Sequence, residues 1–346
     1  MQRRWRVVAT GPWEQLEWQK PLEDAGCEVV LGKSFDQFPG EVYSEQDLID
    51  LLRDADVALV STRDRITRQV LESSPRLKLV VKATIGVEKI DLEAAADLGI
   101  VVVNSPAPEN YLGVAEATVG LAIMLVKRLQ TAQRLLTEGK WKQRALMGTT
   151  VAGKTVGIIG LGRVGTNVAR RLTAWDVRVV FYDPYVEPAV GHAVGAEKVE
   201  LMDLLEISDV VTIHVALTDE TRNMIDKDAL GAMKSSACLI NTARGEAIDE
   251  AALVSALEEG RIAGAALDVY AQEPLPLDSP LRRLEHENLI LTPHSIGNSA
   301  SSQATGIKIA LDNIVAIMGG AEPLYVKNPV ALPKWRARMA TLSMHR

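Results

Sequence analysis

The 346-residue sequence predicts an α/β fold made of two doubly wound domains, one inserted into the other. Three observations support this fold class. Short apolar runs alternate with helical patterns along most of the chain, which is typical of parallel sheets with helices on both faces. A glycine-rich turn near the middle lies between an apolar run and a helix. The alternation is interrupted by Ser105-Pro-Ala-Pro108, a proline-rich break that suits a hinge between domains.

The region before this break contains five predicted strands joined by helical segments. The apolar runs that predict the strands are 6–10, 27–31, 57–61, 77–82 and 100–104. Helical patterns fall at 16–25, from Ser44 onward, at 67–73 and at 91–98, and 34–41 is predicted to be a loop. Ser44 and Asp47 form a serine cap with an acid three residues on, and Gly99 is placed to end the last helix.

One long helix is predicted from Asn110 to Glu138. Its apolar side is wide, which suggests that it is buried between domains or between subunits. No apolar run is expected to reach transmembrane length, because the longest candidate, Val114 to Val126, contains Glu116.

The second half of the chain continues the alternation of strands and helices. Further strands are predicted at 155–159, 177–183, 210–214, 237–242, 264–269 and 289–293. The clearest helices are 163–174, 249–259 and 299–318, and a loop-rich tail is expected after them. Because the helix from Ser299 is predicted to return toward the first domain, that domain should contain both the N-terminus and the C-terminus of the chain.

A glycine fingerprint opens the second domain. The run Thr155-Val-Gly-Ile-Ile159 leads into Gly160-x-Gly162-x-x-Gly165 and then into a helix. Gly160 allows the tight turn, Gly162 lets the backbone approach a pyrophosphate, and Gly165 lets the helix pack closely on the strand. The helix N-terminus then presents unpaired N–H groups to the phosphates.

The acid at the end of the next predicted strand, Asp183, completes the dinucleotide-binding pattern. Its carboxylate suits the ribose hydroxyls of adenosine and would repel a 2′-phosphate, which favours NAD over NADP. The alternative is that three glycines merely separate a strand from a helix. The flanking strands, helix and acid favour cofactor binding over that alternative.

Composition excludes some classes of protein. The net charge of −7 argues against a general nucleic-acid binder.

The two cysteines, Cys27 and Cys238, lie inside apolar runs and are expected to be buried free thiols in a reducing compartment. No long apolar segment follows the basic N-terminus, so no signal peptide is expected and the predicted location is the cytoplasm. No His, Cys or acid cluster has metal-ligand spacing, so no metal is expected.

Three chemically suitable side chains follow strands of the second domain: Arg244, Glu273 and His294. Ligands of doubly wound sheets bind at the carboxyl ends of the strands. Reduction of a 2-keto acid needs a hydride donor, a proton donor and a cation for the carboxylate. His294 can be the acid–base, Glu273 can orient it, and Arg244 can clamp the substrate. Taken singly, each residue has a structural alternative: a surface ion pair, a solvated loop acid, and a capping or core histidine.

These motifs resemble the NAD-dependent D-2-hydroxyacid dehydrogenase family, whose members include D-3-phosphoglycerate dehydrogenase and hydroxypyruvate reductase. The segments that carry the resemblance are Ile85–Asp91, Val114–Glu116, the glycine fingerprint, His214–Thr218, Asn241–Gly245, Leu267–Val269, Gln272–Pro274 and Pro293-His294. The resemblance implies a Rossmann NAD-binding domain, 105–296, inserted into a flavodoxin-like substrate domain, 1–104 and 297–346. It also implies a homodimer formed through the cofactor domain.

The resemblance further implies roles for individual residues. Arg244, Glu273 and His294 would be catalytic, with Arg244 and His294 also contacting substrate. Asp268 would bind the nicotinamide carboxamide, and the backbone at Thr84, Ile85 and Gly86 would hold the substrate carboxylate. The remaining implied cofactor-binding residues are Gly160, Gly162, Arg163, Val164, Gly165, Asp183, His214, Thr242, Ala243 and Gly297.

Departures from the family pattern leave the substrate open. The loop Lys82–Glu88 lacks a glycine and an aspartate that relatives commonly carry. Ser61 stands where phosphoglycerate dehydrogenases have a phosphate-binding arginine. Arg63 and Arg65 either bind a second anionic group or are solvated loop charges. Ile85 stands where phosphite dehydrogenases have a lysine, which disfavours phosphite.

Two other functions remain in competition at this point. One is an NAD-sensing binding protein of the corepressor type on the same fold, which keeps the three site groups. The other is a decarboxylating or formate-type dehydrogenase, although formate relatives lack the His–Glu pair. The residues favour hydride transfer between NAD(H) and C2 of a D-2-hydroxy acid or 2-keto acid.

Overall fold

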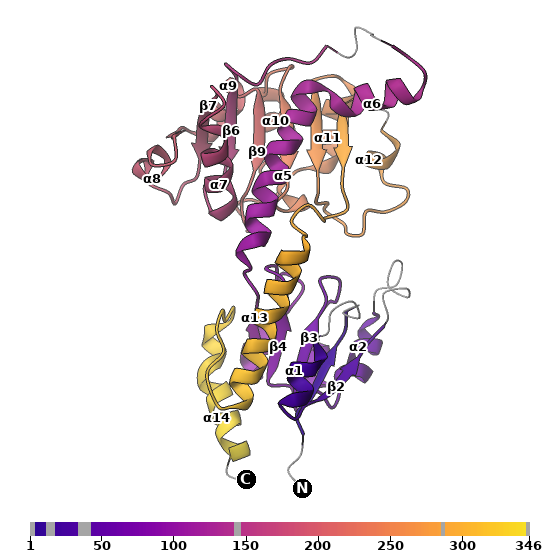
Figure 1. The fold of residues 1–346 in the computed structure, drawn as a ribbon, viewed down its shortest axis with the longest axis vertical. Helices are drawn as coiled ribbons and strands as arrows, with labels where there is room; N and C mark the ends of the chain where they lie inside the picture. Colours follow the sequence, from indigo (N-terminus) through magenta and orange to yellow (C-terminus); the bar gives the residue numbers. More distant parts are fainter. Residues whose placement is uncertain (1–3, 12–17, 34–42, 142–146, 285–287, 344–346) are drawn as a thin grey trace. The chain divides into compact units, whose positions relative to one another are not determined.

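The computed structural model describes residues 4–11, 18–33, 43–141, 147–284 and 288–343, and the chain divides into two compact units (Figure 1). The first unit comprises Met1–Glu109 and Ser299–Arg346, and the second comprises Asn110–Asn298. The second unit is therefore an insertion in the first. The boundaries of the two units lie a few residues beyond the expected 104/105 and 296/297.

The first unit is built on a five-stranded parallel sheet of order β2-β1-β3-β4-β5. This is the flavodoxin-like order that was expected. The strands are β1 (Arg6–Ala9), β2 (Glu28–Leu31), β3 (Val57–Val60), β4 (Leu79–Lys82) and β5 (Val101–Val103). The residues of β3, β4 and β5 are all buried, which explains why these strands are continuous apolar runs.

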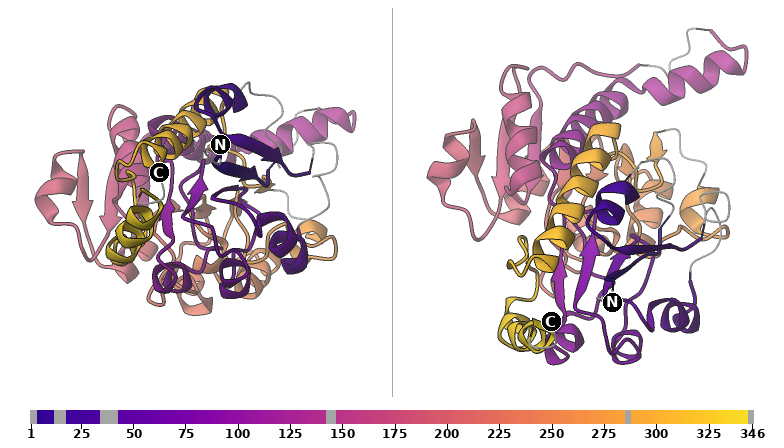
Figure 2. Two further views of the ribbon diagram at one scale, coloured as in Figure 1. Left: turned by 90° about the horizontal axis from the view of Figure 1, so that it is seen from below. Right: turned by 60° about the horizontal axis from the view of Figure 1, so that its bottom comes forward.

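Helices cover both faces of this sheet (Figure 2). One face packs against α2 (Glu45–Leu52), α3 (Arg68–Glu72) and α4 (Leu92–Asp97). The other packs against α1 (Gln19–Asp24), α13 (Ala300–Met318) and α14 (Leu332–Ser343). The predicted start of α2 is confirmed, because Ser44 and Asp47 form a reciprocal capping box.

The expected loop-rich tail is wrong. Its last part is the helix α14, preceded by the short 3₁₀ turn Pro329–Ala331. The side chain of Trp335 from α14 is buried in the same core as α13. The predicted loop 34–41 and the first two residues of the predicted helix 16–25 lie outside the described residues.

The second unit is built on a seven-stranded parallel sheet of order β12-β11-β10-β9-β6-β7-β8. The strands are β6 (Thr155–Ile159), β7 (Arg178–Tyr182), β8 (Ala196–Lys198), β9 (Val210–Ile213), β10 (Cys238–Asn241), β11 (Gly264–Leu267) and β12 (Leu289–Leu291). From β6 outward this is the Rossmann order, and the strand order reverses between β6 and β9. The short edge strand β8 was not predicted.

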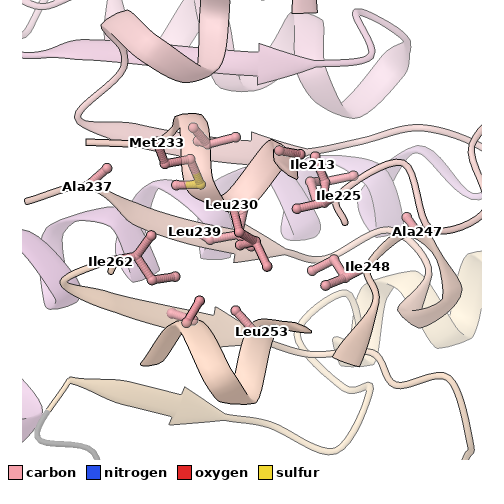
Figure 3. Packing of buried hydrophobic residues seen from close by; sticks show 14 of the residues in the cluster. Ile213, Ile225, Leu230, Met233, Ala237, Leu239, Ala247, Ile248, Leu253 and Ile262 are labelled. Carbon is pink, nitrogen blue, oxygen red and sulfur yellow. The ribbon is translucent and has the colours of Figure 1, made fainter. Parts of the chain in front are cut away.

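Two buried clusters hold the second unit together. The helices α5 (Pro108–Lys127) and α7 (Arg163–Leu172) pack on one face of the sheet. The helices α9 (Leu201–Ile207), α10 (Lys227–Ala232) and α11 (Glu250–Glu258) pack on the other. Figure 3 shows the second cluster, where Leu230 of α10 and Met233, the residue after this helix, lie over Leu239 of β10. The unit also contains the short helices α8 (Pro188–His192) and α12 (Pro280–Arg283). Cys238 is a buried free thiol, as is Cys27 of the first unit, which confirms that both cysteines are buried and unbridged.

The single helix expected from 110 to 138 is also wrong, because two helices occupy this segment. The helix α5 ends at Lys127, Arg128 adopts a left-handed backbone with φ of 54°, and α6 (Leu129–Thr137) follows in a new direction (Figure 1). By length and composition α5 could span a membrane, contrary to expectation, and 39% of its most apolar window is buried. One such helix is weak evidence for a membrane span, because core helices pass the same test.

Candidate active site

The glycine turn after β6 has the geometry that the fingerprint predicts. Gly160 has φ of +91°, and a Cβ there would lie 2.8 Å from the carbonyl oxygen of His214. A Cβ on Gly165 would lie 2.1 Å from the carbonyl oxygen of Gly160, so only glycine allows this approach of α7 to β6. A Cβ on Gly162 would meet nothing within 4 Å. The backbone at Gly162 therefore faces open space, whereas Gly160 and Gly165 are packed.

The N-terminus of α7 suits a bound anion. Gly162 is its N-cap and supplies no side-chain hydrogen bond, and the first turn, which begins with Arg163 and Val164, contains no acidic residue. The guanidinium of Arg163 lies over the ring of Tyr111, 5.9 Å from its centroid. A helix end with this composition leaves backbone donors and a partial positive charge for a phosphate.

Asp183 follows β7 beside this turn. Its Oδ2 accepts a hydrogen bond from the backbone N–H of Leu161 at 2.9 Å, and its Oδ1 accepts one from Tyr185 N–H at 2.9 Å. The carboxylate is therefore held against the glycine turn, at the place where a dinucleotide fold binds the adenosine ribose. Together with the open backbone at Gly162, these residues fit a dinucleotide.

His214 comes directly after β9, at the point where the strand order reverses. Its backbone N–H donates to the carbonyl oxygen of Ile159, and its Nε2 lies 3.0 Å from Oγ1 of Thr212. Burial lowers the pKa of its imidazole to about 3. His214 is therefore neutral at physiological pH and places no charge beside the glycine turn.

The segment after β10 carries Thr242, Ala243 and Arg244. Asn241 at the end of the strand holds it, because its Nδ2 donates to Arg244 O at 2.8 Å and its Oδ1 accepts from Ala243 N–H at 3.1 Å. The buried hydroxyl of Thr242 lies 3.2 Å from that of Thr118. The guanidinium of Arg244 donates from Nη1 to the carbonyl oxygen of Ala243 at 2.7 Å. The role of Asn241 as an anchor was not predicted.

His294 and Glu273 form a direct pair. The Nδ1 atom of His294 lies 2.8 Å from Oε2 and 3.0 Å from Oε1 of Glu273. The histidine side chain is 51% exposed and that of the glutamate is 26% exposed. The hydrogen bond to Glu273 raises the pKa of the imidazole above its ordinary value; burial and the charge of Arg244 oppose the rise. The charge of Arg244 therefore acts on this pair.

The backbone of His294 is unusual, with φ of 52°, and Asp268 holds the segment around it. Asp268 is 2% exposed, and its Oδ1 accepts from Oγ1 of Thr292 at 2.6 Å and from Ser295 N–H at 3.0 Å. Its Oδ2 accepts from Ile296 N–H at 3.4 Å. A non-glycine residue in this left-handed region persists only where its surroundings fix it. Asp268 therefore has a structural task in addition to its predicted role at the nicotinamide.

Gly297 ends this segment and contacts the start of α5. Its carbonyl oxygen accepts a hydrogen bond from Nδ2 of Asn110 at 3.1 Å. A Cβ at this position would lie 2.8 Å from Cγ2 of Val114. The glycine therefore permits a close approach of the His294 segment to α5, and its predicted contact with the cofactor remains a prediction.

The predicted substrate loop belongs to the first unit, directly after β4. The carbonyl oxygen of Thr84 accepts from Ser105 N–H at 3.0 Å, and that of Ile85 accepts from Nδ2 of Asn104 at 2.7 Å. These bonds fix the loop that contains Gly86. Lys82 at its start is buried and donates to Ser61 O at 2.6 Å, and burial lowers the pKa of this amine to about 8.

Comparison with known proteins shows the family to which the chain belongs. Residues 119–295 match the family model described as "D-isomer specific 2-hydroxyacid dehydrogenase, NAD binding domain". The chain is 37% identical to a D-3-phosphoglycerate dehydrogenase of Methanocaldococcus jannaschii over 331 residues, which are 95% of this chain and 60% of the relative. It thus spans about three fifths of the length of that relative.

A second relative is matched over nearly its whole length. The chain is 38% identical to a glyoxylate reductase of Thermofilum pendens over 311 residues, which are 88% of this chain and 90% of that protein. Among solved structures, the D-lactate dehydrogenase from Aquifex aeolicus complexed with NAD and lactic acid is 28% identical, with a TM-score of 0.80, over 91% of this chain and 96% of that one.

Proposed function

The chain belongs to the D-isomer-specific 2-hydroxyacid dehydrogenase family, and we propose on this basis that it transfers a hydride between NAD(H) and C2 of a D-2-hydroxy acid or its 2-keto partner. The observation that carries this proposal is the His294–Glu273 pair, which follows two strands of the NAD-binding domain and has Arg244 in its electrostatic neighbourhood.

His294 is the proposed acid–base. Because Glu273 faces Nδ1, the other ring nitrogen, Nε2, is left to exchange a proton with the substrate oxygen. During reduction the imidazolium donates this proton to the ketone oxygen, and during oxidation the neutral imidazole removes it from the hydroxyl. Glu273 stabilises the charged form and fixes the orientation of the ring.

Arg244 is the proposed substrate clamp. Its guanidinium is planar, always charged and able to donate two parallel hydrogen bonds to a carboxylate. The bond from Nη1 to the carbonyl oxygen of Ala243 limits the orientations of the side chain. In the first unit, the backbone of Thr84, Ile85 and Gly86 is proposed to contact the substrate carboxylate as well.

The second unit holds the cofactor, and bound NADH supplies the hydride. The proposed contacts are the backbone of Gly162, Arg163 and Val164 for the pyrophosphate and Asp183 for the adenosine ribose. Gly160 and Gly165 shape this turn. The other proposed cofactor contacts are His214, Thr242, Ala243, Asp268 and Gly297.

A homodimer through the second unit is also proposed. Only 39% of the most apolar window of α5 is buried within the chain, and Leu129 and Leu136 of α6 are exposed together with Trp141 and Met147 just beyond it. Exposed apolar surface on neighbouring helices is typical of an interface between subunits. A cytoplasmic location is proposed on the basis of the metabolic relatives.

The substrate is proposed to be a small 2-keto acid. The relatives described above are named for glyoxylate, D-3-phosphoglycerate and D-lactate, so the family itself varies in substrate side chain. A phosphorylated 2-keto acid is also a candidate, because Arg63 and Arg65 could bind its phosphate as a second anionic group. The corepressor-type alternative has no support among these relatives.

The direct test is a panel of 2-keto acids, each assayed for oxidation of NADH at 340 nm. Glyoxylate, pyruvate and a phosphorylated 2-keto acid represent the three relatives, and formate with NAD⁺ is the control for the rival reaction. Reduction of pyruvate or the phosphorylated 2-keto acid to its D-hydroxy product, or of glyoxylate to the achiral glycolate, supports the proposal. NADH binding without turnover of any panel member would argue for a sensor instead.

A further inference from the structure

Tyr270 lies among the three chain segments that carry Arg244, Glu273 and His294. It follows β11, three residues before Glu273, and is 6% exposed. We propose that Tyr270 is a positioning residue that fixes these three segments relative to one another, so that the imidazole and carboxylate meet in the geometry the reaction needs. This inference rests on the proposed function and assigns Tyr270 no contact with the reacting atoms.

The first connection runs from Tyr270 to Glu273. The backbone N–H of Tyr270 donates to Oε1 of Glu273 at 3.1 Å. The same oxygen lies 3.0 Å from Nδ1 of His294. The carboxylate is therefore held from its own loop while it faces the imidazole, and movement of the loop at Tyr270 would move Glu273 with it.

The second connection runs from the Tyr270 hydroxyl to the His294 segment. The hydroxyl lies 2.9 Å from the carbonyl oxygen of Thr292 and 3.2 Å from that of Leu267. The carbonyl oxygen of Leu267 already accepts a hydrogen bond from Thr292 N–H at 2.9 Å. The carbonyl oxygen of Thr292 is also the nearer of the two acceptors, so we assign the hydrogen bond of the Tyr270 hydroxyl to it.

The Tyr270 hydroxyl binds the carbonyl of Thr292, which lies two residues before the strained backbone of His294. His294 has φ of 52°, a conformation that a non-glycine residue keeps only when its neighbours are fixed. Asp268 fixes the segment through Oγ1 of Thr292 and the N–H of Ser295. Tyr270 fixes the carbonyl of the same Thr292, so the two residues hold the start of the segment by different atoms.

The third connection runs to the turn that carries Arg244. A Cβ on Gly245 would lie 1.9 Å from the carbonyl carbon of Tyr270 and 2.3 Å from Ala271 N. The backbone after Arg244 therefore packs directly on the backbone of Tyr270. In addition, Ala271 N–H donates to Oε1 of Glu250 in the first turn of α11 at 2.6 Å, which ties this contact to the body of the unit.

The hydroxyl is suited to a permanent positioning role. Burial raises the pKa of Tyr270 to about 12, so its hydroxyl remains a donor at every pH at which the protein would work. The charged groups that act on His294 are Glu273 and Asp268, which favour the imidazolium, and Arg244, which opposes it. Tyr270 adds no charge to this set and acts only through position.

The test is Tyr270→Phe, which removes the hydroxyl and keeps the ring and the backbone N–H. The matched control is Ser208→Ala, which also removes a buried hydroxyl that donates to a backbone carbonyl, at 2.6 Å from Leu204 O, but before β9 rather than after a strand. Two quantities are measured: the pKa of His294 by NMR titration, assigned with His294→Gln, and kcat, KM and their pH dependence.

We expect Tyr270→Phe to lower the pKa of His294 in the same direction as Glu273→Gln and to lower kcat about 10-fold, while KM for NADH stays within about twofold. Ser208→Ala should change none of these. A His294 pKa and kcat equal to those of wild type in Tyr270→Phe would overturn the inference, as would an equal change in Ser208→Ala. If wild type turns over no 2-keto acid, the proposed function fails, and the titration still decides whether Tyr270 positions His294.

Discussion

The Nδ1 atom of His294 lies 2.8 Å from Oε2 of Glu273, and these two residues follow different strands of one parallel sheet. The contact fixes which ring nitrogen faces away from the carboxylate and stabilises the protonated ring. The pair depends on the order β12-β11, which brings the ends of these strands side by side.

Glu273→Gln should move the pH dependence of the reaction. The glutamate raises the pKa of His294, and reduction needs the imidazolium, so reduction is lost as the pH rises through that raised pKa. In Glu273→Gln this limb of kcat/KM should move to lower pH, toward the ordinary value of about 6.5. Oxidation needs the neutral ring, so the pH at which kcat/KM for oxidation rises should also move to lower pH. If the pH profiles of Glu273→Gln for both reduction and oxidation match those of wild type, Glu273 does not set this pKa.

Arg244→Lys should damage substrate use more than cofactor binding. Lysine keeps the charge but loses the planar fork, so kcat/KM for the 2-keto acid should fall about 100-fold. The dissociation constant for NADH, measured by fluorescence titration, should stay within about twofold because the carboxylate clamp is a substrate contact. Full activity of the lysine variant would mean that a point charge suffices at this position.

The two glycines of the turn should respond differently to alanine. Gly165→Ala places a Cβ 2.1 Å from a backbone carbonyl oxygen, so it should lower the free energy of unfolding by about 2 kcal/mol or more. Gly162→Ala meets nothing within 4 Å in the protein, so it should unfold like wild type and yet bind NADH at least about 10-fold more weakly. Thermal unfolding and NADH titration separate the two effects. Normal NADH affinity in Gly162→Ala would exclude a close approach of the cofactor at that glycine.

Leu136→Glu should weaken the proposed dimer. The side chain of Leu136 on α6 is 59% exposed, so burial by a second copy is its expected environment in solution, and a carboxylate there would lose its hydration. Light scattering should show a mass that falls from dimer to monomer. The matched control is Val190→Glu on α8, an apolar residue of the same unit that is 50% exposed. A monomeric wild type, or a dimer unaffected by Leu136→Glu, would remove α6 from the interface.

The sequence predicts best what is local. The glycine turn and the capping box at Ser44 each depend on residues a few positions apart, and each has the predicted geometry. Asp183 lies against the glycine turn, and its contact with the ribose stays a prediction. The parallel sheets follow from alternation alone, because a strand buried on both faces must be a short apolar run. The edge strand β8 was missed because it has only three residues and two of them are polar.

Other features arise from tertiary structure and leave little trace in the sequence. Arg128 interrupts the helix expected from 110 to 138 in a left-handed conformation, with no glycine or proline there to indicate it. The tail helix α14 is fixed by burial of Trp335 against the core of the first unit. The contacts of Asp268 and Tyr270 with Thr292 depend on the pairing of β11 with β12, so their positioning tasks could not be predicted from spacing.

The central claim is that His294 transfers the proton while the nicotinamide transfers the hydride. Its most direct test is single-turnover oxidation of bound NADH by a 2-keto acid in wild type and in His294→Gln, with NADH affinity measured in parallel. We expect the variant to bind NADH normally and to react about 100- to 10,000-fold more slowly, which is the usual contribution of a general acid. An unchanged single-turnover rate in His294→Gln would contradict the account.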